Sequence, residues 1–141
     1  MSITTNSLLN KLVKGKHLDT VLDKYEDDFY DGTISDYLNQ LCNERNLVPE
    51  HVILKAQIER TYGHQFFNGT RTPSRDKLIQ LAFGFGLSLD ETQKLLEISG
   101  KSILYPKIKR DAICIYAISH QMSVMELQDM LDSNGLPILG T

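Results

Sequence analysis

Apolar residues recur along the whole chain at intervals of three and four residues. Residues with this spacing share one face of an α-helix, whereas a half-buried strand would alternate apolar and polar residues. No segment alternates for long enough to predict a strand, so we expect an all-α fold. The clearest N-terminal stripes are Leu8, Leu9, Leu12 and Val13; Leu18, Val21, Leu22, Tyr25 and Phe29; and Ile34, Tyr37, Leu38, Leu41 and Cys42.

Polar caps, prolines and glycines mark where the predicted helices begin and end. A hydroxyl residue followed three positions later by an acid is typical of a capping box, and this pattern occurs at Thr33, Ser88 and Ser123. After Ser88, a helix starting at Pro106 is apolar on more than one side, so we expect it to be central. Further starts are expected at Pro49 and Pro73, and further stops at Asn68-Gly69, Gly84 or Gly86, Gly100 and Asn134-Gly135.

The composition indicates a globular protein of the cytoplasm. The 141 residues are 41% hydrophobic and 23% charged, which is typical of a domain with its own core. No apolar run approaches the roughly 18 residues of a membrane span, and no secretory signal pattern is present, so we expect no membrane association. Cys42 and Cys114 form no CxxC motif and are expected to be buried, reduced thiols. The apolar tail 136–139 should dock on the body of the protein or on a second subunit.

Positive charge is concentrated in the middle of the chain. The whole chain has 15 basic and 18 acidic residues and a net charge of −3, which excludes a globally basic nucleic-acid binder. Residues 55–77, however, have a local net charge of +3, so a locally basic binding surface is compatible with the composition. The charged residues of this stretch are Lys55, Arg60, Arg71, Arg75 and Lys77 against Glu59 and Asp76.

Motifs that indicate catalysis or metal binding are absent from the sequence. It contains no GxxxxGK[ST], GxGxxG, GxSxG or HExxH motif, and the glycine pair at 84–86 is interpreted as a turn. The four histidines are too far apart for a local metal motif. We therefore expect a protein that is not an enzyme and that uses neither a cofactor nor a metal.

Residues 47–74 read LVPEHVILKAQIERTYGHQFFNGTRTPS. This segment resembles the XRE, or phage-repressor-like, helix-turn-helix family, whose pattern is a short helix 2, a tight turn, recognition helix 3 and an N-G-x-R-x-P-S loop. The loop pattern matches residues 68–74, and the similarity covers about residues 33–100. The flanking sequences resemble small XRE-type proteins of Firmicutes that carry helical extensions at both ends.

The resemblance implies a phage-repressor-like five-helix domain at 33–100, with helical extensions at 1–32 and 101–141. It further implies a bacterial, cytoplasmic transcription regulator that binds double-stranded DNA. A homodimer held by the C-terminal extension is expected, because one recognition helix reads only a few base pairs. Helix 2 would span 49–56, the turn 57–59 and helix 3 60–67.

Helix 3 of such a domain lies in the major groove, where its outward side chains reach base edges. Arginine suits guanine and glutamine suits adenine, while residues of the following loop contact phosphates. The resemblance therefore assigns base contacts to four residues of helix 3 and phosphate contacts to three residues after it. These are Arg60, Thr61, His64 and Gln65 for the bases, and Asn68, Arg71 and Arg75 for the phosphates.

Three departures from the family pattern leave a second function open. Pro49 stands where family members often have a glutamine that contacts phosphate, and Gly63 replaces an apolar core residue of helix 3. Glu59, at the N-cap of helix 3, favours the helix dipole but would repel DNA phosphates. The alternative is a protein-interaction module on the same fold. Chains of this type that accompany signalling kinases make a kinase a candidate partner.

Overall fold

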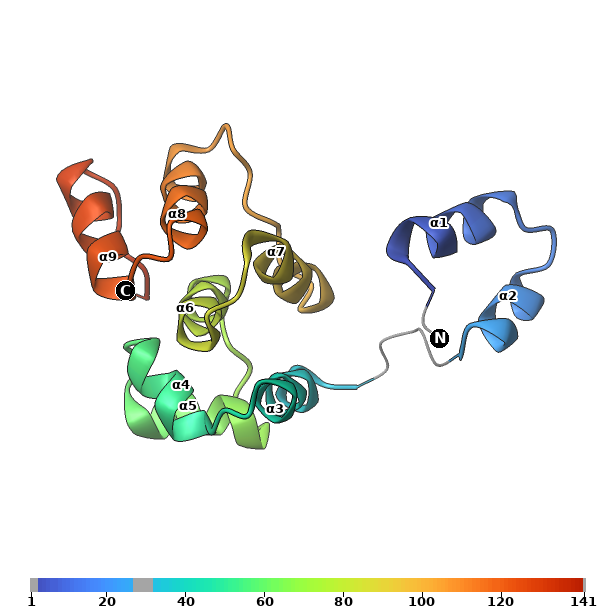
Figure 1. Ribbon diagram of the computed structural model, residues 1–141, viewed down its shortest axis with the longest axis horizontal. Helices are drawn as coiled ribbons and strands as arrows, with labels where there is room; N and C mark the ends of the chain where they lie inside the picture. Colours follow the sequence, from blue (N-terminus) through green and yellow to red (C-terminus); the bar gives the residue numbers. More distant parts are fainter. Residues whose placement is uncertain (1–2, 27–31, 141) are drawn as a thin grey trace. The chain divides into compact units, whose positions relative to one another are not determined.

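The computed structural model describes residues 3–26 and 32–140 (Figure 1). These residues form nine α-helices and no β-strand, which confirms the expected all-α class. The chain divides into two compact units, Met1–Asp31 and Gly32–Thr141. The helices are α1 (Thr5–Lys14), α2 (Leu18–Lys24), α3 (Ile34–Arg45), α4 (Pro49–Lys55), α5 (Arg60–Asn68), α6 (Arg75–Phe85), α7 (Leu89–Ile98), α8 (Lys109–Ser119) and α9 (Val124–Ser133).

The first unit contains α1 and α2, which carry the first two apolar stripes. Thr4 caps α1 by accepting a hydrogen bond from the Ser7 backbone N–H at 3.2 Å. No residue of either helix is buried, and the side chains of Leu9 and Val13 are exposed. Phe29, expected at the end of the second stripe, lies outside the described residues.

The second unit is built around α6, which Figure 1 shows between the α4–α5 pair and the two C-terminal helices. Seven of its eleven residues are buried, among them the polar Gln80. A helix that is covered on all sides must let its neighbours approach closely. Gly84 allows this approach, because a Cβ there would lie 2.4 Å from the carbonyl oxygen of Val52 in α4.

The helix expected after Pro106 differs from the prediction in its start and in its place. α8 begins at Lys109, since Ile108 has the extended backbone of an N-cap residue and its N–H donates to the Tyr105 carbonyl in a turn. The prediction of a central helix was also wrong, because Ile108 and Tyr116 are each 52% exposed. Some apolar residues of α8 face the core and others face the surface. The spacing of apolar residues in the sequence does not predict which of them will be buried.

Local backbone chemistry sets several of the helix boundaries. The predicted capping boxes at Thr33, Ser88 and Ser123 are all present, each with its reciprocal hydrogen bonds. Gly69 and Gly86 follow α5 and α6 in the left-handed conformation, with φ angles of 82° and 71°. The boundaries predicted from caps and glycines are confirmed at these positions.

The C-terminal helices share one apolar core with the rest of the second unit. Buried residues of α8, α9 and the tail belong to the same cluster as those of α3 to α7. The amide of Gln128 exchanges two hydrogen bonds with the Leu139 backbone, at 2.7 and 2.9 Å. Of the two expectations for the apolar tail, docking on the body is therefore confirmed. None of the helices described is long and apolar enough to cross a membrane.

Candidate nucleic-acid interface

α4 and α5 are joined by a tight turn whose backbone is anchored to α6. Gln57 takes the left-handed conformation, with a φ angle of 58°. From α6, the buried Gln80 amide donates hydrogen bonds to the carbonyls of Ala56 at 3.1 Å and Gln57 at 3.4 Å. The two helices therefore leave the turn in a fixed relation, and their ends lie within one residue of the predicted boundaries.

Gly63 lets α5 lie close against α4. A Cβ at this position would lie 2.5 Å from Cγ2 of Ile53, so a larger residue would force the Ile53 side chain or the helix backbone to shift. On the same inner side, Phe66 is fully buried and the Tyr62 ring meets it edge-on, with 4.8 Å between the ring centroids. Packing thus occupies the inner face of α5 and leaves the outer face to polar residues.

One carboxylate holds two of the predicted base-contacting residues. Glu50, in the first turn of α4, accepts a hydrogen bond from Arg60 Nε at 2.7 Å, and its other oxygen lies 2.6 Å from His64 Nε2. The hydrogen bonds from Arg60 and then His64 lower the pKa of Glu50 below its ordinary value. The Arg60 side chain is nevertheless 76% exposed, so the cluster lies at the surface.

Glu59 caps the start of α5. Its carboxylate accepts hydrogen bonds from the backbone N–H groups of Tyr62 at 2.8 Å and Thr61 at 3.0 Å, and these bonds lower the pKa of Glu59. The charge stabilises the helix, because the N-terminal end of the helix dipole is positive. It also occupies the end of α5 to which an anion would otherwise bind. The exposed Thr61 side chain lies next to this acid in the first turn.

The loop after α5 folds back onto the helix through Arg71. Arg71 Nε donates to Gln65 Oε1 at 2.7 Å, and its guanidinium lies 5.2 Å from the centroid of the Tyr62 ring. Lys77, from α6, places its ammonium 5.9 Å from the same ring centroid. Two cations therefore gather on one aromatic ring beside Gln65, and the ring stabilises both through its electron-rich face.

The other two predicted phosphate contacts are engaged with the protein itself. The side-chain oxygen of Asn68 accepts the Thr70 backbone N–H at 2.9 Å, which shapes the loop. Arg75 forms a two-pronged pair with Asp111 of α8, at 2.9 and 3.1 Å, and also donates to the carbonyl oxygens of residues 102 and 103. Arg75 thus lies at the α6–α8 junction. The residues that the structure brings to the outer side of α5 are Arg60, Thr61, His64, Gln65 and Arg71.

Glu50 and Lys77 belong to this surface although the sequence did not predict them as site residues. Lys77 lies in the basic stretch, but its place beside Tyr62 depends on how α6 packs against α5. Glu50 precedes Arg60 by ten residues, and their contact depends on the angle between α4 and α5. The residue types and the local charge could be read from the sequence, whereas the contacts of Glu50 with Arg60 and of Lys77 with Tyr62 could not.

Metal centres and reactive thiols are two other kinds of reactive site to consider among the described residues. No group of three or more metal-ligating side chains occurs in the ranges 3–26 and 32–140. Both cysteines are buried, and burial raises the pKa of Cys114 to about 11, which disfavours a reactive thiolate. Comparison with known proteins finds no matching family model, no similar curated protein and no similar solved structure.

Proposed function

We propose that the chain is a sequence-specific, DNA-binding transcriptional regulator with a phage-repressor-like helix-turn-helix domain in residues 33–100. The observation that carries this proposal is the α4–turn–α5 unit. Its outer face presents Arg60 and His64, both bonded to Glu50, and Gln65, which is bonded to the loop cation Arg71. In this motif the second helix enters the major groove while the first crosses the phosphate backbone. The regulator acts in the cytoplasm as a homodimer.

In this proposal the side chains of α5 read the bases. The Arg60 fork matches the O6 and N7 acceptors of guanine, and the Gln65 amide matches N6 and N7 of adenine. Thr61 and His64 contact neighbouring base edges. Because Glu50 holds Arg60 and His64 in the free protein, both residues exchange this carboxylate for base acceptors on binding.

Residues of the loop and of α6 hold the phosphates. Arg71 and Asn68 donate to phosphate oxygens, and Lys77 adds a second cation beside Arg71. Arg75 has a positioning role instead, because its donors are bound to Asp111 and to backbone carbonyls. It fixes the start of α6 and therefore the end of the loop that carries Arg71.

A protein partner is the second candidate function, favoured by the acids on the same surface. Glu50 and Glu59 both have lowered pKa values, so both are negatively charged at neutral pH. Two carboxylates on this surface attract a basic protein surface and repel DNA. The two functions therefore predict opposite effects when Glu59 loses its charge.

The first experiment measures binding of the full chain to a random pool of double-stranded DNA at two salt concentrations, with sequencing of the retained DNA. A recurrent motif is expected. Arg60→Ala and Gln65→Ala should each lower affinity for it by about five- to a hundredfold and relax the preference at one base. Lys107→Ala, an exposed cation outside the site, is the matched control. Failure to enrich any motif at either salt concentration would contradict the proposal.

The second experiment separates DNA from a protein partner. Glu59→Gln keeps an oxygen that can cap α5 but removes its charge. DNA binding should become severalfold tighter in this variant, because the repulsion between Glu59 and phosphate is lost. If a basic protein captured from cell extract binds the variant more weakly, and neither form binds DNA, the partner function is correct instead.

A further inference from the structure

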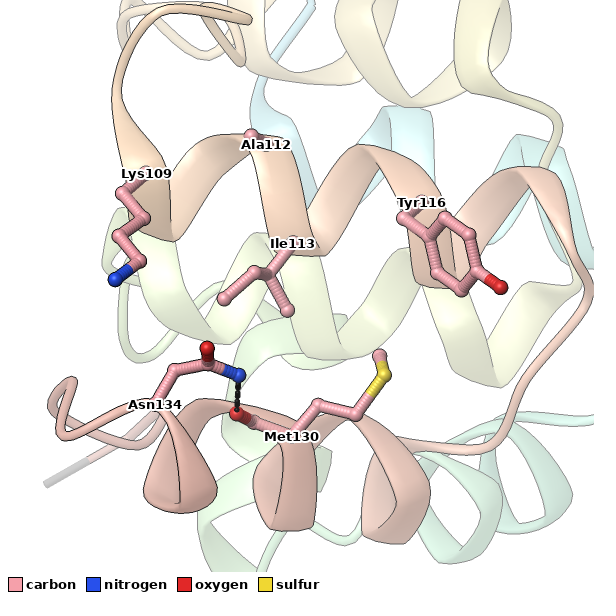
Figure 2. A pocket seen from close by; sticks show the side chains of 6 residues that line it. All are labelled: Lys109, Ala112, Ile113, Tyr116, Met130 and Asn134. Carbon is pink, nitrogen blue, oxygen red and sulfur yellow. Dashed lines mark hydrogen bonds between the residues drawn. The ribbon is translucent and has the colours of Figure 1, made fainter.

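An apolar groove lies between α8 and α9 on the second unit (Figure 2). Its volume is about 260 Å³. On the inner side of the C-terminal helices Leu127, Leu131 and Leu139 are buried in the core, so these residues are not available to a partner. The groove is lined by four residues of α8 and two at the end of α9, which are Lys109, Ala112, Ile113, Tyr116, Met130 and Asn134.

The four α8 residues of the groove form a single helix face. They follow one another at intervals of three, one and three residues, which is the spacing of a stripe that packs against another helix. Ala112, in the middle of the stripe, is small enough to let a second backbone approach. Tyr116 is half exposed, and its ring is stacked on His120 with 3.9 Å between the ring centroids. The groove therefore has the shape and composition of a helix-binding site.

This stripe is complementary to itself. Figure 2 shows Lys109 and Tyr116 at opposite ends of the stripe, with Ala112 and Ile113 between them. A second α8 that runs antiparallel, with a two-fold axis between positions 112 and 113, places Lys109 opposite the partner's Tyr116 at both ends. Each ammonium then lies over an aromatic ring and near the negative C-terminal end of the facing helix. Lys109 is available for this contact, because it forms no ion pair with a described residue.

We propose that the α8–α9 groove is the docking site for a second copy of this chain, with the two α8 helices antiparallel about a two-fold axis. Such an interface is isologous, so the same residues serve both subunits and the assembly stops at a dimer. The inference deepens the proposed function and rests on it in one respect: two recognition helices are needed to read two half-sites. The face, its spacing and its charges are properties of α8 itself.

Sedimentation equilibrium of the full chain at micromolar concentrations tests the dimer. The parent should be dimeric, and Tyr116→Glu should raise the dissociation constant about a hundredfold, because it removes two ring contacts and buries two charges. Lys109→Ala should raise it about tenfold. The matched control is Met125→Glu, at an exposed apolar residue of α9 that does not line the groove, and its dissociation constant should equal that of the parent. A monomeric parent, or a Tyr116→Glu variant that stays dimeric, would overturn the proposal.

A cross-link tests the orientation of the two helices. In the antiparallel pairing, position 112 lies beside the two-fold axis, so Ala112→Cys should form a disulfide-linked dimer under mild oxidation. The native thiols do not interfere, because both are buried. Met125→Cys is the control and should not cross-link. Absence of the cross-link at position 112 in a dimeric protein would overturn the antiparallel arrangement.

DNA binding distinguishes a failure of this proposal from a failure of the proposed function. If Tyr116→Glu is monomeric and binds a single half-site with the preference of the parent, both proposals stand. If the parent selects DNA but Tyr116→Glu remains dimeric, only the groove assignment fails. If the parent selects no DNA while Tyr116→Glu loses the dimer, the interface stands and the DNA-binding function fails.

Discussion

Four arginines of this chain have two different uses. Arg60 and Arg71 lie on the outer side of α5 and its loop, where each Nε donates to one side-chain oxygen. Arg75 and Arg110 lie at the α6–α8 junction, where each forms a two-pronged pair with an aspartate and donates to two backbone carbonyls. The first pair can exchange its partners for those of a ligand, whereas the second pair is built into the fold.

Burial explains the difference between the two groups. The Glu50 side chain that pairs with Arg60 is 48% exposed, whereas that of Asp111, which pairs with Arg75, is 5% exposed. An exposed ion pair contributes little to stability, but breaking a buried one leaves a charge without compensation. The C-terminal helices supply this burial, so they determine which cations of the basic stretch stay available on the surface.

The largest expected effect is on stability, from Asp111→Ala. The change leaves the charge of the largely buried Arg75 guanidinium without its carboxylate partner and removes the acceptor of the Tyr105 backbone N–H, which bonds to Asp111 at 3.0 Å. The free energy of unfolding, measured by urea denaturation, should fall by about 3–5 kcal/mol. Asp132→Ala, at an exposed position of α9, is the control and should change it by less than about 0.5 kcal/mol. If Asp111→Ala lowered the free energy of unfolding no more than the control, the Arg75–Asp111 pair would contribute as little to stability as an exposed ion pair.

The second expected effect is a dependence of stability on pH at the same junction. The hydrogen bonds from Arg110 lower the pKa of Asp76 below its ordinary value of 3.8. Stabilisation by Asp76 is therefore complete above this ordinary value and is lost as the pH falls through the lower, folded-state pKa. As the pH is lowered from neutrality through the folded-state pKa, the unfolding free energy should fall less in Asp76→Asn than in the parent, because the variant has no carboxylate to protonate at this position. Asp132→Asn serves as the control, and an identical pH dependence in both variants would contradict the assignment.

The helices and their ends were largely predictable from the sequence, because caps and stops are local. Ser88 with Glu91 and Gly86 after α6 act within one turn, and the predicted boundaries hold there. The place of α8 was not predictable, since its apolar residues serve the core on one side and remain exposed on another. Spacing reports that a helix has an apolar face but not what covers it.

The candidate site was predictable only in part, for a related reason. Arg71 and Arg75 are four residues apart in the same basic stretch, so the sequence treats them alike. Their surroundings differ because Asp111, 36 residues after Arg75, comes to the start of α6. Gln65 of α5 and Arg71 of the following loop are only six residues apart, so their contact is local. The contact between Arg75 and α8 depends instead on tertiary packing.

The third prediction contrasts these two arginines directly. Arg71→Ala should weaken binding to all DNA sequences alike and reduce the salt dependence by about one ion, because a phosphate contact is lost. Its free energy of unfolding should change by less than about 0.5 kcal/mol. Arg75→Ala should show the opposite pattern, with a large loss of stability. Binding titrations at several salt concentrations, together with urea denaturation, measure both quantities. Equal stability losses in the two variants would show that Arg71 and Arg75 contribute alike to the fold.

The smallest expected effect comes from Glu50→Gln, which tests how loosely the α5 surface is paired. The amide can still accept a hydrogen bond from Arg60, so the side chains keep much of their arrangement. Because the negative charge is lost, DNA binding should become about two- to fivefold tighter. Arg60 and His64 are then held less strongly in the free protein, and the phosphates of the DNA are repelled less. Glu97→Gln, an exposed acid of α7, is the matched control for the change in net charge. A weaker complex in Glu50→Gln alone would mean that the carboxylate positions Arg60 and His64 for the bases. In that case the exposed Glu50–Arg60 pair would have a fixed structural role, as the Arg75–Asp111 and Arg110–Asp76 pairs have.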